Sequence, residues 1–213
     1  MREVFQQELR EVKQRLVGLA ELVEASIQQA TEAFGSSDVQ LAERVIDMNE
    51  QVDQLTHELD ELTIDILARQ QPVASDLRLM VVSLRIGASL NRMCDLAQHI
   101  AQLARYRYPE SAVPEGLRKL FRRMGEYDTR IAGILVALLR DEDPRLIDEI
   151  RDIDHRIDEL HVRVFEKVLS DKINSDITGV VDATLASRYH ERFGDHAVEI
   201  SRQVNFFLRG EVE

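Results

Sequence analysis

Two pairs of acidic residues in the C-terminal half of the chain are each separated by four positions. Asp154 and Asp158 form one pair, and Glu191 and Asp195 form the other. Residues four apart in an α-helix lie on one face, one turn from each other. If the two helices pack as neighbours, the four carboxylates converge, and a hard cation bound through oxygen would offset their repulsion. These four residues are therefore candidate metal ligands.

The corresponding positions in the N-terminal half carry weaker donors. Asn49 pairs with Asp53, and Asn91 pairs with Asp95. An amide oxygen can ligate a cation, but it brings no charge. Asp53 and Asp95 are therefore also candidate metal ligands, in a site that we expect to be weaker.

Spacing alone is a weak signal for metal. The chain has 39 acidic residues, so pairs four apart arise often. Each acid also has arginines within reach, such as Arg188 and Arg192, and exposed ion pairs of this kind are common on helices. A solvated, ion-paired surface therefore stays open as the alternative.

Other catalytic arrangements are missing from the sequence. A di-iron carboxylate bundle needs Glu-x-x-His on two helices, and the nearest match is Asp158 with His161. There is no glycine-rich phosphate loop and no serine on a nucleophile elbow. The one cysteine, Cys94, excludes an intrachain disulfide and is interpreted as a small core residue. We expect no enzymatic activity.

Composition and charge favour long helices in a cytoplasmic protein. Among 213 residues, 44% are hydrophobic and only 5% are aromatic, with 9 Gly and 4 Pro. The net charge of −12 opposes binding to nucleic acid, whose affinity comes mainly from neutralised phosphates. The N-terminus is too polar for a signal peptide. No apolar run approaches the roughly 20 residues of a membrane span, so we expect no membrane insertion.

Helical periodicity places the candidate ligands on six helices. Apolar residues recur at steps of three and four from Phe5 to Phe34 and again from Leu41 to Ile66, as in the seam of a helical bundle. Residues 35–38, Gly-Ser-Ser-Asp, supply a stop and a start signal between these two helices. No stretch alternates as a β-strand would.

Proline marks the later boundaries. Pro72 interrupts the second helix because it lacks an amide proton, and Pro109 and Pro114 mark the one extended break. The remaining helices are expected from about Ala74 to Tyr106, from Leu117 to near Arg140, from a start at residues 141–144 through Val164, and from a cap at residues 174–176 to about Arg209.

The two halves repeat. A shift of 100 positions lays the third helix on the sixth, and a shift of 105 lays the second on the fifth. Polar positions match as well as apolar ones, which indicates duplication. The matches include Ser75 with Ser175, Asp76 with Asp176, Arg92 with Arg192, and Asp95 with Asp195. The predicted fold is all-α, with two tandem, pseudo-symmetric three-helix bundles at residues 1–108 and 115–213.

At these residues the sequence resembles the PhoU family. Residues 191–197, Glu-Arg-Phe-Gly-Asp-His-Ala, nearly match the Glu-Arg-Ile-Gly-Asp-like core in the last helix of each family half. Residues 91–95, Asn-Arg-Met-Cys-Asp, are a degenerate copy, and residues 71–78 look like the family's start to the third helix. The resemblance covers essentially the whole chain.

The resemblance implies a protein that is often dimeric, and some relatives carry clusters of metal ions on the acidic motifs, so divalent or iron-type ions are the implied cofactors. Asn91 departs from the family acid, which weakens the expectation of a full cluster in the first half. In decreasing order of match, the implied ligands are Glu191 and Asp195, then Asp154 and Asp158, then Asp95 and Asp53.

The resemblance also implies a function. Members of the family repress the phosphate-starvation response and phosphate uptake when phosphate is plentiful. The resemblance implies that they do so as adaptors between the phosphate transporter ATPase and a membrane sensor histidine kinase. A metal-storage or metalloenzyme bundle is the alternative. A purely structural coiled coil is disfavoured by the matched polar positions.

Overall fold

Six long α-helices make up nearly all of the part of the chain that the computed structural model describes, residues 2–170 and 177–210. No β-strand occurs in these ranges, which confirms the predicted all-α fold. The helices are α1 (Arg2–Ser36), α2 (Val39–Gln70), α3 (Ala74–Arg107), α4 (Arg118–Asp141), α5 (Arg145–Val168) and α6 (Ile177–Arg209), with a short 3₁₀ helix η1 (Glu115–Leu117) before α4.

Local sequence signals account for the helix boundaries. The side chain of Asp38 accepts a hydrogen bond of 3.0 Å from the amide of Leu41 and so caps α2. At the start of α5 the Asp143 carboxylate accepts a 3.0 Å hydrogen bond from the Arg145 amide, as a capping residue does, and Pro144 between them already has helical φ and ψ. The cap predicted at residues 174–176 lies outside the described residues.

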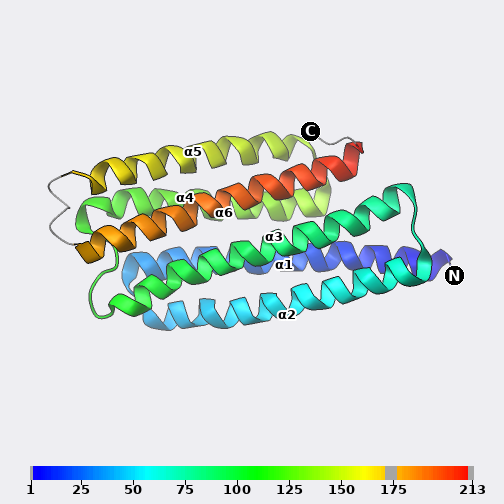
Figure 1. The fold of residues 1–213 in the computed structure, drawn as a ribbon, viewed down its shortest axis with the longest axis horizontal. Helices are drawn as coiled ribbons and strands as arrows, with labels where there is room; N and C mark the ends of the chain where they lie inside the picture. Colours follow the sequence, from blue (N-terminus) through cyan, green and yellow to red (C-terminus); the bar gives the residue numbers. More distant parts are fainter. Residues whose placement is uncertain (1, 171–176, 211–213) are drawn as a thin grey trace.

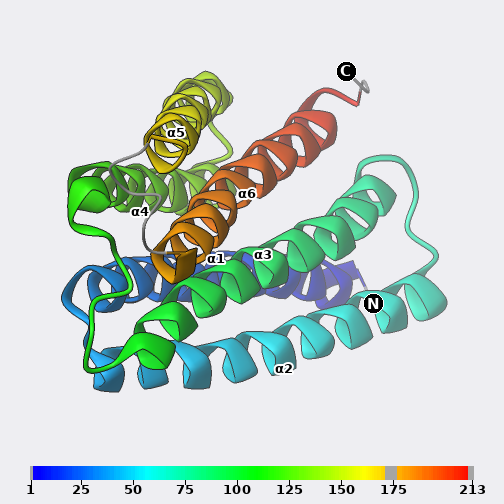
Figure 2. The same ribbon diagram turned by 60° about the vertical axis from the view of Figure 1, so that its left-hand side comes forward.

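The helices form two groups that lie side by side (Figure 1). Helices α1, α2 and α3 pack against one another, and so do α4, α5 and α6. The groups meet where α1 packs on α4 and α3 packs on α6, and the turned view shows the same arrangement (Figure 2). The predicted unit limits, 1–108 and 115–213, stay a prediction.

The apolar stripes of the sequence point into a continuous core. Val12, Ile27, Val52 and Leu59 are fully buried, as the three- and four-residue steps predict. Cys94 is fully buried too, and burial raises the pKa of its thiol to about 12, which confirms its assignment to the core. No helix within the described ranges is long and apolar enough to cross a bilayer.

Candidate functional site

The packing of α5 on α6 brings the four acids of the second half to one face of the molecule. Asp154 and Asp158 come from α5, and Glu191 and Asp195 come from α6. Asp195 is exposed, whereas the other three are partly buried, and only 14% of the Glu191 side chain is exposed. The two helices therefore present a shared acidic face, as the spacing predicted.

Asp154 is the most perturbed of these four carboxylates. Burial, reinforced by repulsion from Asp158, Asp195 and Glu191, raises the pKa of its carboxyl to about 7. The charged form is disfavoured because little water reaches it and like charges surround it. Asp154 therefore holds a proton at pH values at which an ordinary aspartate has lost it.

The neighbours of Asp154 are perturbed in the same direction. Burial raises the pKa of the Asp158 carboxyl, with a further contribution from Asp195. Burial and then Asp195 also raise the pKa of Glu191, against the opposing effect of Arg188, which pairs with it. A positive charge placed among these groups would relieve the strain that their ionisation creates.

Two oxygens of this acidic face have unused hydrogen-bonding capacity. Asp154 Oδ1 and Glu191 Oε2 are buried and find no hydrogen-bond partner among the described residues. Helices α5 and α6 approach closely at Gly194, where an added Cβ would overlap Asp154 Oδ1 and lie 3.3 Å from Ile157 Cδ1. Buried polar atoms without partners are uncommon and mark places where an ion or water can bind.

The first half is built differently at the matching positions. Asn49 donates from Nδ2 to Asp95 Oδ1 at 3.3 Å, and Arg92 pairs with Asp95 at 2.8 Å. Asp53 is exposed on α2. Asp95 is thus already held by a donor and a cation, and the structure does not join Asp53 to it. Asn49 Oδ1 and Asn91 Oδ1 are also buried without a hydrogen-bond partner among the described residues, but they carry no charge. This arrangement therefore has less need of a metal ion than the acidic face of α5 and α6.

As the side chains stand, no three His, Cys, Asp or Glu residues within 2–170 and 177–210 are arranged to hold a metal ion. The second half nevertheless offers the donor type that hard cations prefer, with two unpartnered carboxylate oxygens. The donor set of Asp154, Asp158, Glu191 and Asp195 therefore fits a hard cation in chemistry, and side-chain rotation would have to complete the ligand set.

A buried pair that was not predicted from the sequence lies beneath this face. Asp128 of α4 contacts His190 Nδ1 through its Oδ2, and the two side chains are 0% and 1% exposed. Burial raises the pKa of Asp128, against the opposing effect of His190. The burial of Asp128 could have been predicted from its spacing, because it stands four residues after Met124 and three before Ile131, at a core position of the apolar stripe.

The chain matches the sequence model of a known family along most of its length. The family described as PhoU domain matches twice, at residues 16–104 and 121–204. A relative in Mycobacterium tuberculosis, named phosphate-specific transport system accessory protein PhoU homolog 2, is 35% identical over 99% of this chain and 99% of its own. The homolog 1 of Mycobacterium leprae is 33% identical over 99% of this chain and 95% of its own.

Solved structures agree with this similarity. The crystal structure of PhoU from Pseudomonas aeruginosa superposes with a TM-score of 0.91 at 28% identity, over 97% of this chain and 100% of that one. The phosphate transport system regulatory protein PhoU from Streptococcus pneumoniae superposes with a TM-score of 0.88 at 23% identity, over 98% and 99%, and shows the likeness of fold.

Proposed function

This chain belongs to the PhoU family, and we propose that it is a regulatory accessory protein of phosphate transport that acts by binding and not by catalysis. The observation that carries the proposal is similarity over the entire length, in both halves, to proteins named for that role. Fold alone would be a weaker reason, because one fold can host many functions.

The more specific proposal is that the protein represses the phosphate-starvation response when phosphate is plentiful. It would join the transporter ATPase to a sensor histidine kinase and hold the kinase in its repressing state. A binding protein can do this only by favouring one state of its partner over another. We propose that it acts in the cytoplasm, as a homodimer.

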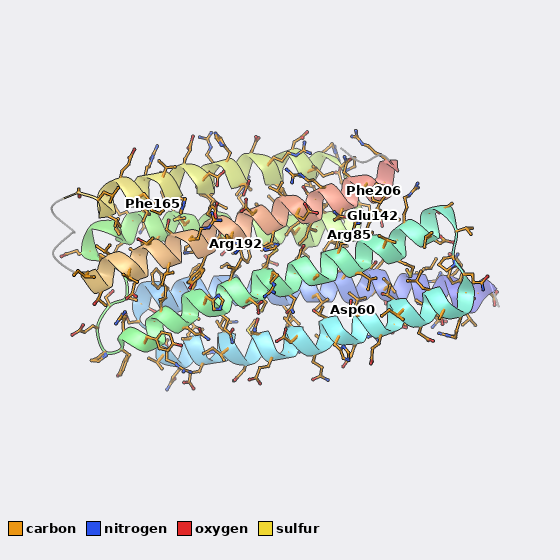
Figure 3. The ribbon with its side chains drawn as sticks, in the orientation of Figure 1. Asp60, Arg85, Glu142, Phe165, Arg192 and Phe206 are labelled. Atoms are coloured by element: carbon orange, nitrogen blue, oxygen red, sulfur yellow. The ribbon has the colours of Figure 1, made fainter. Side chains whose placement is uncertain are left out.

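An exposed apolar end of the second helix group supports action through protein contact. Large apolar side chains gather where α5 ends and α6 begins, and Phe165 marks this end in Figure 3. Exposed apolar patches of this kind are typical of surfaces that contact other macromolecules. The residues are Val162 and Phe165 on α5, Leu169 directly after it, and Ile177, Val181 and Leu185 on α6, each at least 40% exposed.

Phosphate uptake and co-purification test the adaptor proposal. Deleting the gene should raise the rate of phosphate uptake in phosphate-rich medium, and a plasmid copy should restore it. The tagged protein should co-purify with the transporter ATPase from phosphate-replete cells. Unchanged uptake in the deletion strain, together with no recovery of the ATPase, would count against an adaptor role.

Metal binding at the acidic face of α5 and α6 is the second candidate function. The unpartnered oxygens of Asp154 and Glu191 and the raised pKa of Asp154 favour it. Asp154, Asp158, Glu191 and Asp195 would hold a divalent or iron-type ion, which would neutralise their charge and tie α5 to α6. A metal-storage role or a metalloenzyme activity would use the same residues.

Two matched double variants test the metal site. Replacing both Glu191 and Asp195 with alanine should remove most of the metal from the purified protein. The matching change in the first half, Asp53→Ala with Asp95→Ala, should lower it much less, because that half has fewer acids to contribute. Elemental analysis after incubation with Mg²⁺, Mn²⁺ or Fe²⁺ gives the readout. Equal losses from the two doubles, or no loss from the first, would refute the assignment.

A further inference from the structure

An open hollow of about 410 Å³ lies between α3 and α6, on the seam where the two helix groups meet. Three of the eight residues that line it are arginines, and they come from both helices. The charged and titratable residues around it are Arg92, Asp95 and His99 of α3 and Arg188, Tyr189, Arg192 and His196 of α6. The volume is within the range of sites that bind small molecules.

The gathering of three arginines in one hollow contrasts with the net charge of the protein, which is −12. Arg92 is partly balanced by Asp95 at 2.8 Å, and Arg188 is paired with Glu191. Arg192 lines the hollow without a hydrogen bond or an ion pair to any residue in the described ranges. The hollow therefore contains a guanidinium whose N–H donors are unused in the described residues, with two further arginines beside it.

The internal duplication brings two equivalent arginines together here. Arg92 and Arg192 match when the sequence is shifted by 100 positions, and both lie near the middle of their helices. Helices α3 and α6 run in opposite directions across the seam, so their midpoints meet (Figure 1). Figure 3 shows Arg192 on α6 beside α3. Two guanidinium groups that lie close together repel each other. An anion bound between them would be attracted to both and would offset that repulsion.

The guanidinium group specifies the kind of anion. Its planar fork of N–H donors matches the oxygens of phosphate and carboxylate, and it binds phosphate in two-point contacts. The guanidinium groups of Arg92 on α3 and Arg192 on α6, with histidines nearby, suit an anion that carries several oxygens. The only carboxylate lining the hollow, Asp95, already accepts from Asn49 and Arg92.

We infer that this hollow binds a phosphoryl group, held by Arg92 and Arg192 from the two halves of the molecule. The group is either inorganic phosphate or the phosphate of a small metabolite, because the hollow has room for both. The biological role of this site rests on the proposed function, because a regulator of phosphate transport would then bind phosphate directly. The binding can be measured on purified protein without that function.

Isothermal titration calorimetry on the full chain tests the inference. Inorganic phosphate and, separately, adenosine 5′-monophosphate are titrated at constant ionic strength with EDTA present, so that no metal at the acidic face carries the anion. Wild-type protein should bind at one site. Arg92→Gln with Arg192→Gln should weaken binding by about tenfold or more, because two charge-assisted contacts are lost.

Arginines on other faces provide the matched control. Arg122→Gln with Arg156→Gln removes two exposed arginines that pair with acids outside the hollow, and it should leave the affinity unchanged. Because both hollow arginines are exposed, we expect their variant to fold, and circular dichroism checks this. If it does not fold, Arg192→Gln alone serves, with a smaller loss expected.

The outcomes separate the possibilities. Loss of phosphate binding only in the hollow variant supports a site for inorganic phosphate, and the same loss only for the nucleotide supports a site for a phosphorylated metabolite. Absence of binding by both ligands, or equal affinities in wild type and hollow variant, overturns the inference. A protein that binds neither ligand and still represses starvation genes would lose this inference and keep its proposed function.

Discussion

The half-buried carboxyl of Asp154 links the stability of the fold to pH. Its pKa in the folded protein, about 7, lies above that of an ordinary aspartate. The folded protein therefore holds a proton over a range in which the unfolded chain has lost it. This contribution to stability is present below the unfolded value and is lost as pH rises between about 4 and 7.

Asp154→Asn should remove this loss of stability with rising pH. The variant should resemble wild type in stability at acidic pH and exceed it above neutrality, because an amide feels no repulsion from the nearby carboxylates. Urea unfolding across this pH range, with EDTA to exclude metal, measures the effect. Asp53→Asn, at an exposed position, is the control and should follow the wild-type curve. Parallel curves for Asp154→Asn and wild type would contradict the assigned pKa.

Single residues also show where prediction from sequence ended. Four-residue spacing predicted that Asp154 and Asp158 share one face with Glu191 and Asp195. It did not predict which carboxylate becomes buried, because that depends on the close approach of the helices at Gly194. Asp128 interrupts an apolar stripe, but its partner His190 is 62 positions away and was found only when α4 and α6 were seen together.

At the scale of elements, Gly125 sets how closely α4 can pack on α1 across the seam. A Cβ added there would lie 2.8 Å from Thr31 Cβ, which is too close to be relieved by a flexible side-chain end. Gly125→Ala should therefore push the helices apart. Overpacking costs about 1–3 kcal/mol, against a gain of about 1 kcal/mol from helix propensity. We expect the free energy of unfolding to fall by up to about 2 kcal/mol.

Gly18 is a control position, where replacement by alanine changes helix propensity without creating a steric clash. Gly18 lies in the middle of α1, and a Cβ there would meet nothing within 4 Å. Gly18→Ala should raise the free energy of unfolding by up to about 1 kcal/mol through helix propensity alone. Chemical denaturation of both variants gives the comparison. A Gly125→Ala protein as stable as Gly18→Ala would show that the helices do not pack as described.

The helices themselves were largely predictable, because their boundaries depend on local chemistry. The Asp38 cap, the break at Pro72 and the apolar stripes are all short-range signals, and each predicted boundary in the described ranges lies within a few residues of the observed one. The pairing of α1 with α4 and of α3 with α6 was not predicted. It depends on small residues such as Gly125 and on distant polar partners, which leave no periodic signal.

At the scale of the whole molecule, an ion pair ties the two helix groups together. Arg107 at the end of α3 contacts both carboxylate oxygens of Asp182 on α6, with Nη2 to Oδ1 at 2.9 Å. The Asp182 side chain is 4% exposed, whereas that of Arg107 is 36% exposed. Removing the arginine would leave a buried carboxylate without its bidentate partner.

Arg107→Ala should therefore lower the free energy of unfolding by about 3 kcal/mol, at the low end for a buried pair because Arg107 is partly solvated. Arg130→Ala removes an exposed pair with Glu149 and should cost less than about 1 kcal/mol. Thermal and urea unfolding give both values. Equal, small losses in the two variants would show that the seam does not depend on the Arg107–Asp182 pair.

The proposed repression of the phosphate-starvation response is measured most directly with a promoter reporter. A starvation promoter fused to a fluorescent protein is followed in phosphate-replete cells that carry or lack the gene and have no second copy. We expect the promoter to be active in the deletion strain and to become inactive again when the gene is returned. A reporter that stays silent in the deletion strain would contradict it.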